Sequence, residues 1–218
     1  MVDTTDKKGR EDGRQTREKL LSCAIELTAQ KGFSAVTSKE ICTRAGTNLA
    51  AVNYHFGGRD GLYEAMIYAV HNRMLNETLL KELVASDLSP REKLERFADN
   101  LLRGIQNRAW TDMDGMALRV WLREGLSGSE RFLPAARHIA AAKGPWLLKL
   151  FHDYTGLPSD DKRLYAAIIA FVAPFLALLF STSLPQSYRT ALNATALQPA
   201  VIAAVRQQAF AGLDSLKE

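Results

Sequence analysis

Apolar residues recur at helical spacing along most of the chain. Leu20, Leu21, Ala24 and Ile25 belong to a stripe with a period of about 3.6 residues that ends at Gly32. The stripe predicts a first helix over residues 16–31, preceded by a mobile charged arm over residues 1–15. Segments that alternate apolar and polar residues are nearly absent, so we expect almost no strands. The pattern predicts an all-α protein.

Two short helices should follow the first. The run Thr37-Ser38-Lys39-Glu40 is a capping box, in which the threonine hydroxyl and the glutamate carboxylate satisfy backbone N–H groups at a helix start. Gly46 suits the left-handed conformation that ends a helix. Asn48 is a strong N-cap for a third helix over residues 49–55, which Gly57-Gly58 should end.

Longer helices are expected over the rest of the chain, at about residues 59–74, 90–105, 112–126, 133–154, 160–182 and 197–216. Short loops at 87–89, 127–129, 156–159 and 183–187 join them. Pro145 should start a new helix or kink one. We therefore expect a small N-terminal domain over residues 16–58 and a larger helical body over residues 59–218.

One apolar run, Leu164–Phe180, has to be considered as a candidate membrane span. Its 17 residues are at the short limit for a span, and Pro174 lies inside it. A helix buried by protein is the preferred interpretation, with no membrane partner. The polar segment Met1–Arg14 has no apolar core of a secretory signal, so a cytoplasmic location is expected. Cys23 and Cys42 lie outside any metal spacing and are expected to be small buried hydrophobes in a reducing compartment.

Composition excludes several classes of protein. Of the 218 residues, 47% are hydrophobic and 24% are charged, which is enough apolar surface to exclude disorder for the bulk of the chain. The formal charge of +4 is only mildly basic. The run Gly125–Ser129 departs by one residue from the G-x-S-x-G motif of serine hydrolases, and the histidines lack metal-ligand spacing. We therefore expect no catalytic residue, no metal and no cofactor.

The segment Thr37–Phe56 carries the functional signal. A short helix that begins with small residues and stands on a helical platform fits the major groove of DNA. Its first residues would touch thymine methyl groups, Asn53 could bond to adenine, and the tyrosine, histidine, threonine and arginine are types that hold phosphate oxygens. The candidate DNA-binding residues are Thr37, Lys39, Thr47, Asn48, Leu49, Ala50, Ala51, Asn53, Tyr54, His55 and Arg59.

Some of these residues have alternative roles that are purely structural. Tyr54 could be a core aromatic, as Phe56 is expected to be. His55 could simply cap Gly57-Gly58 at the surface, and Lys39 could be a solvated helix residue.

Seven short motifs make the N-terminal region resemble the TetR family of transcriptional regulators. They are Thr16-Arg17-Glu18, Lys31-Gly32-Phe33, Val36-Thr37, Glu40-Ile41, Arg44-Ala45-Gly46, Tyr54-His55-Phe56 and Leu62-Tyr63. The resemblance covers residues 16–66. It implies a homodimer whose third helix enters the major groove of a palindromic operator, whose C-terminal body binds a small ligand, and whose last two helices form the dimer interface.

Two residues depart from the usual pattern of the family. Asn53 stands where a tyrosine is usual, and Arg59 stands where a lysine is usual. Arg59 keeps the positive charge, so phosphate binding should survive. The run Asn48–Phe56 is similar to that of a subgroup that carries the Asn53 variant.

The body offers candidates for binding an apolar or amphipathic small molecule. They are Trp110, Met113, Met116, Arg119, Trp121, Trp146 and Phe175, of which the apolar members could equally be plain core. Arg119 and Arg123, four residues apart, could clamp an anionic group, and the preferred alternative is a salt bridge to Glu124 or Glu130.

The leading hypothesis is a repressor that a small-molecule ligand releases from DNA. The competing hypotheses are an enzyme and a DNA-binding protein without sequence preference or inducer. The sequence offers few pairs of residues that could act together in catalysis, and this argues against the enzyme. The small net charge argues against binding that depends on phosphates alone.

Overall fold

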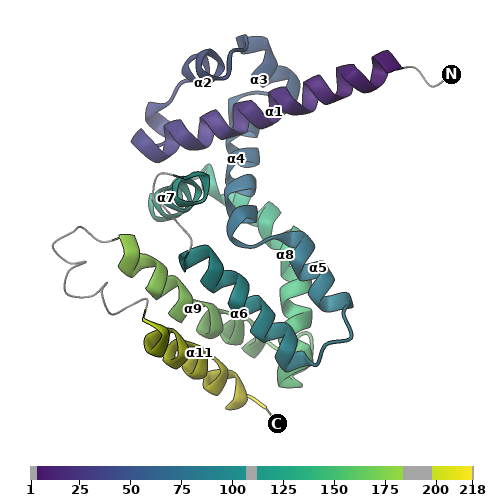
Figure 1. Ribbon diagram of the computed structural model, residues 1–218, viewed down its shortest axis with the longest axis vertical. Helices are drawn as coiled ribbons and strands as arrows, with labels where there is room; N and C mark the ends of the chain where they lie inside the picture. Colours follow the sequence, from purple (N-terminus) through teal and green to yellow (C-terminus); the bar gives the residue numbers. More distant parts are fainter. Residues whose placement is uncertain (1–3, 107–111, 184–197, 218) are drawn as a thin grey trace. The chain divides into compact units, whose positions relative to one another are not determined.

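The computed structural model describes residues 4–106, 112–183 and 198–217, and the regular elements among them are all helical (Figure 1). The chain divides into two compact units. One comprises residues 1–74 and 109–140, and the other comprises residues 75–108 and 141–218. The all-α architecture expected from the sequence is confirmed. The expected functional boundary between residues 58 and 59 remains a prediction and differs from the boundaries of these units.

The first unit holds the segment that was expected to bind DNA. Its elements are α1 (Thr4–Lys31), the 3-10 helix η1 (Phe33–Ala35), α2 (Ser38–Ala45), α3 (Leu49–Phe56), α4 (Arg59–Met74), α7 (Met113–Leu126) and the first part of α8 (Phe132–Thr155). Helix α7 packs on both α1 and α4. Their shared core includes Leu20, Phe33, Tyr63, Met66 and Val120, each with at most 1% of its surface exposed.

The second unit contains α5 (Glu77–Ala85), α6 (Pro90–Gln106), the rest of α8, α9 (Arg163–Ser183) and α11 (Pro199–Asp214). Helix α9 packs against α6 and α11. The rings of Phe97, Phe151, Phe175 and Phe210 surround Phe171, with centroids 5.3–6.1 Å from it. An aromatic cluster of this kind provides most of the burial in a small helical core.

The first helix begins earlier than the apolar stripe indicates. The expected start of the first helix at residue 16 is wrong, because residues 4–15, where a mobile arm was expected, continue α1. Arg14 forms ion pairs with Glu11 and Glu18, and the Thr16 hydroxyl donates to the Asp12 carbonyl oxygen at 2.9 Å. Pairs three and four residues apart stabilise an exposed helix without any apolar stripe.

Two further differences concern helix boundaries. Helix α5 was not expected, although Asn76 caps it by accepting a hydrogen bond from the Thr78 N–H at 2.8 Å. Helix α8 runs continuously through Pro145, so no new helix starts there. The predicted start of α6 is confirmed, because Glu92 accepts a hydrogen bond from the Ser89 N–H at 2.8 Å.

The apolar run Leu164–Phe180 lies within α9. None of the helices in the described ranges is long and apolar enough to cross a membrane. Leu164, Phe171 and Phe175 are buried in the second unit. Residues 184–187 of the predicted loop and Leu197, the expected first residue of the last helix, lie outside the described residues. Cys42 is buried as expected, whereas Cys23 is only partly buried.

Candidate nucleic-acid interface

The start of α2 is held by the predicted capping box. The Thr37 hydroxyl accepts from the Glu40 N–H at 3.1 Å, and Glu40 accepts from the Thr37 N–H at 2.8 Å. Lys31, at the end of α1, lies 2.6 Å from the other carboxylate oxygen of Glu40. Hydrogen bonds from Lys31 and then from Thr37 lower the pKa of Glu40 to about 2. This carboxylate therefore joins the end of α1 to the start of α2.

The turn between α2 and α3 depends on the conformation of Gly46. Its φ of 69° lies in the left-handed region, and nothing lies within 4 Å of the position of a Cβ atom there. Backbone conformation, and not space, is thus the reason for a glycine. The Thr47 N–H donates to the Cys42 carbonyl oxygen at 2.9 Å, and the Asn48 side chain accepts from the Ala51 N–H at 3.2 Å. These bonds fix where α3 begins.

Helix α3 presents one face to solvent. Leu49 is 55% exposed and Tyr54 is 83% exposed, and Ala50 and Asn53 on the same face are exposed as well. Val52, on the opposite face, is buried with 1% of its surface exposed. Exposed large apolar and aromatic side chains at the surface of a short, well-capped helix indicate a contact surface.

Other predicted DNA-binding residues occupy two kinds of position. Thr37, Lys39 and Asn48 are exposed near α3, at or close to the starts of α2 and α3. Ala51 is partly buried against the core of the first unit, as is Phe56, which was expected to be a core aromatic. His55 lies against α1, since its Cε1 atom would be 4.0 Å from a Cβ at Gly13.

Thr47 and Arg59 are turned inward. The Thr47 hydroxyl oxygen is buried and has no hydrogen-bond partner among the described residues. Arg59 donates to the Phe33 carbonyl oxygen at 2.8 Å, and its guanidinium carbon lies 4.4 Å from the centroid of the Phe33 ring. Burial lowers the pKa of Arg59. Arg59 thus stabilises the domain, and its predicted contact with phosphate would require it to leave this position.

Behind the interface, Glu124 of α7 holds the backbone between α1 and α2. One carboxylate oxygen accepts from the Phe33 N–H at 3.2 Å, and the other accepts from the Tyr63 hydroxyl at 3.1 Å. Glu124 is only 6% exposed. Burial, together with the charge of Glu124, raises the pKa of Tyr63. Arg123 also reaches this region and donates to the Thr28 carbonyl oxygen at 3.4 Å.

From the sequence, Glu124 is expected only as a salt-bridge partner of Arg119 or Arg123. The signal for its structural role was its spacing, because it follows the buried residues Ala117 and Val120 by seven and four positions. A carboxylate in the apolar stripe of a helix requires buried hydrogen-bond partners.

The candidate ligand residues are divided between the two units. Met113, Met116 and Trp121 pack against the core of the first unit. In the second unit, Trp146 lies beneath the ammonium group of Lys81, at 5.8 Å, and Phe175 is buried. Arg119 is partly buried on α7. Trp110 lies outside the described residues. Within the described ranges, no group of three or more His, Cys, Asp or Glu residues is placed to hold a metal ion.

Comparison with known proteins identifies the N-terminal region. Residues 20–66 match the model of the family described as bacterial regulatory proteins, tetR family. The chain is 25% identical over 170 residues to the HTH-type transcriptional dual regulator CecR of Shigella flexneri, covering 76% of each protein. It is 33% identical over 82 residues to the probable HTH-type transcriptional regulator YttP of Bacillus subtilis, covering 38% of each. The names of both relatives describe HTH-type transcriptional regulators.

Solved structures agree with this fold over nearly the whole chain. A putative transcriptional regulator from Pseudomonas aeruginosa PAO1 superposes with a TM-score of 0.65 at 18% identity, covering 91% of this chain and 90% of that one. NalD, the secondary repressor of the MexAB-OprM multidrug efflux pump in Pseudomonas aeruginosa, superposes with a TM-score of 0.59 at 20% identity, covering 93% and 95%. At these identities the likeness concerns the fold alone.

Proposed function

We propose that residues 20–66 are a DNA-binding domain of the tetR family of bacterial regulatory proteins. On this premise, the protein is a transcriptional repressor that a small molecule releases from a palindromic operator. The observation that carries the proposal is the solvent-facing side of α3. Leu49, Ala50, Asn53 and Tyr54 share it, and the caps at Asn48 and Gly57 define both ends of the helix.

The exposed side of α3 supports a specific division of roles. The major groove is about 12 Å wide and admits an α-helix. Leu49 and Ala50, in the first turn, would contact thymine methyl groups, and Asn53 would bond to a base. Tyr54, Thr37, Lys39 and the other candidate residues around α3 would contact the phosphate backbone and fix the register. The subgroup suggested by the run Asn48–Phe56 belongs to this proposal as well.

A homodimer is supported by the surface of α9. Tyr165, Ile169 and Leu176 are 59%, 68% and 37% exposed, and their spacing of four and seven residues places them on one side of the helix. A second copy of the chain would cover this apolar side, with α11 alongside. Dimers of this kind bury more than about 1,000 Å² and present two recognition helices about 34–36 Å apart, one turn of DNA.

Release by a ligand follows from linkage. A ligand that binds more tightly to a dimer whose recognition helices have a different spacing lowers the affinity for the operator. The operator lowers the affinity for the ligand by the same factor. The proposed contacts for an apolar or amphipathic effector remain Met113, Met116, Arg119 and Trp121 in the first unit, Trp146 and Phe175 in the second unit, and Trp110, which lies outside the described residues. The protein would act in the cytoplasm, where the operator lies.

The test is selection of a binding site from genomic fragments, followed by gel shifts on the selected duplex. Ala50→Glu should abolish binding, because a carboxylate would face the groove and its phosphates. Thr78→Glu, on an exposed position of α5, adds the same charge away from α3 and should bind normally. Tyr54→Phe should weaken binding to operator and random DNA alike, because it removes only a phosphate contact.

Two results would overturn the proposal. One is a selection that yields no palindromic site. The other is wild-type affinity of Ala50→Glu for the selected site, which would mean that α3 does not enter the groove.

A further inference from the structure

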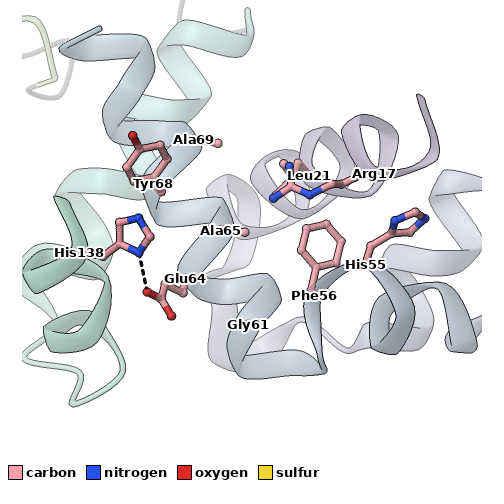
Figure 2. A pocket seen from close by; sticks show the side chains of 10 residues that line it. All are labelled: Arg17, Leu21, His55, Phe56, Gly61, Glu64, Ala65, Tyr68, Ala69 and His138. Atoms are coloured by element: carbon pink, nitrogen blue, oxygen red, sulfur yellow. Dashed lines mark hydrogen bonds and ion pairs between the residues drawn. The ribbon is translucent and has the colours of Figure 1, made fainter. Parts of the chain in front are cut away.

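A cavity of about 640 Å³ that is open to solvent lies within the first unit, next to the end of α3 (Figure 2). Its volume is in the range of about 300–1,000 Å³ that is usual for small-molecule sites. It is formed by α1, the end of α3, α4 and α8. Its lining combines aromatic, small and charged side chains: Arg17, Leu21, His55, Phe56, Gly61, Glu64, Ala65, Tyr68, Ala69 and His138.

The floor of the cavity lacks bulky side chains. Gly61, Ala65 and Ala69 are spaced four residues apart on α4, so they share one face of that helix. Figure 2 shows Phe56 on one side of Ala65 and Tyr68 on the other. A flat apolar floor between two aromatic side chains suits a planar ring, since such rings pack favourably against aromatic edges and faces.

The charges in the lining do not balance. Glu64 is already engaged, with Oε1 3.1 Å from Nδ1 of His138 (Figure 2). The guanidinium carbon of Arg17 lies 5.1 Å from the centroid of the Phe56 ring. No carboxylate of the described residues pairs with Arg17. The lining therefore offers an unmatched cation beside an aromatic ring, with His55 as the other ionisable group nearby.

We infer that this cavity binds a small planar aromatic carboxylate. The ring packs against Phe56 and Ala65, and the carboxylate accepts hydrogen bonds from the paired N–H groups of Arg17 in the bidentate geometry that guanidinium forms with carboxylates. Glu64 disfavours a second acidic group at the opposite end. The site is distinct from the residues proposed above for the effector.

Occupancy of the cavity would reach the recognition helix directly. Phe56 is the last residue of α3, and its carbonyl oxygen would be only 1.8 Å from a Cβ atom at Gly61. The end of α3 is therefore seated on the same turn of α4 that forms the cavity floor. An effect on operator affinity rests on the proposed function, whereas binding of the carboxylate does not.

The experiment is calorimetric titration of the full-length protein, without DNA, with naphthoate. The neutral naphthalenemethanol, the cationic naphthylmethylamine and inorganic phosphate serve as matched probes. Naphthoate should bind, and amide NMR signals of residues around Gly61–Ala69 should shift. The alcohol, the amine and phosphate should each bind at least about tenfold more weakly, as expected for loss of a charge-assisted hydrogen bond or of ring burial.

Variants assign the site. Arg17→Gln should weaken naphthoate binding by about tenfold or more, and Arg17→Lys should weaken it less, since a charge remains. Arg137→Gln removes an exposed arginine of α8 outside the lining and should bind as the wild type does. Ala65→Leu should block the ring. Should Ala65→Leu lower the melting temperature, Arg17→Gln still decides, because Arg17 is exposed.

Three outcomes would overturn the inference. Wild-type affinity of Arg17→Gln for naphthoate would show that the ligand does not bind in this cavity. Equal binding of the amine would remove the role of the cation. Equal binding of phosphate would show a site for any anion, such as a DNA phosphate, in place of a site for an aromatic acid. Gel shifts remain a separate measurement, so failure of this site leaves the proposed DNA binding untouched.

Discussion

The carboxylate of Glu124 is the clearest point at which α7 stabilises the connection between α1 and α2. Glu124→Ala removes the acceptor of two buried donors, the Phe33 N–H at 3.2 Å and the Tyr63 hydroxyl at 3.1 Å. Phe33 and Tyr63 are each only 1% exposed, so water cannot easily replace the lost acceptor. We expect the variant to lose stability and to hold the connection between α1 and α2 less firmly.

The magnitude follows from the two hydrogen bonds. A buried polar group left without a partner costs about 1–3 kcal/mol. Removal of the carboxylate also relieves the cost of burying its charge, which offsets part of this loss. The net decrease in the free energy of unfolding should be about 2–4 kcal/mol. Glu124→Gln should lose only about 1 kcal/mol, because its amide oxygen can still accept from the Phe33 N–H.

The assay is urea unfolding followed by circular dichroism at one fixed protein concentration, since the stability of a dimer depends on concentration. Tyr63→Phe and the double variant complete a double-mutant cycle with Glu124→Ala. The two changes should be coupled by about 1 kcal/mol, because each removes the same hydrogen bond. The reasoning is refuted if the free energy of unfolding of Glu124→Ala is within about 0.5 kcal/mol of the wild-type value, or if the effects of Glu124→Ala and Tyr63→Phe are additive.

Three other predictions concern single positions. Gly61→Ala should destabilise the first unit by more than about 3 kcal/mol in thermal unfolding, because its Cβ would lie 1.8 Å from the Phe56 carbonyl oxygen. The control Gly13→Ala, whose Cβ would meet nothing closer than 4.0 Å, should not lose stability, and equal stabilities of the two variants would contradict the prediction. Burial lowers the pKa of Lys143 from 10.5 to about 8, so the unfolded chain holds the proton more tightly, and the free energy of unfolding should rise by about 1.5 kcal/mol between pH 8 and about pH 9.5. The rise should be missing in Lys143→Met, and an unchanged rise there would assign it to another group. Ile169→Lys should convert the dimer into a monomer at micromolar concentration in light scattering, and a persistent dimer would place the interface elsewhere than on α9.

Local sequence signals determined the helices α2 and α3 and the turn between them. The capping box at Thr37, the left-handed Gly46 and the N-cap at Asn48 were all predicted, and the structure contains each of them. These features depend on hydrogen bonds between residues at most five positions apart, so the residue types and their spacing suffice to specify them. The same locality let the exposed side of α3 be expected from the small residues at its start.

Contacts between distant residues decided the remainder. Glu124 meets Phe33 across 91 positions and Tyr63 across 61, and Arg59 bonds to Phe33 across 26, so the partners of these side chains could not be predicted from spacing. The cavity beside Phe56 likewise needs α1, α4 and α8 to pack together. The sequence determines which hydrogen bonds a side chain can form. Its actual partner is determined only when the helices pack and exclude water from the groups between them.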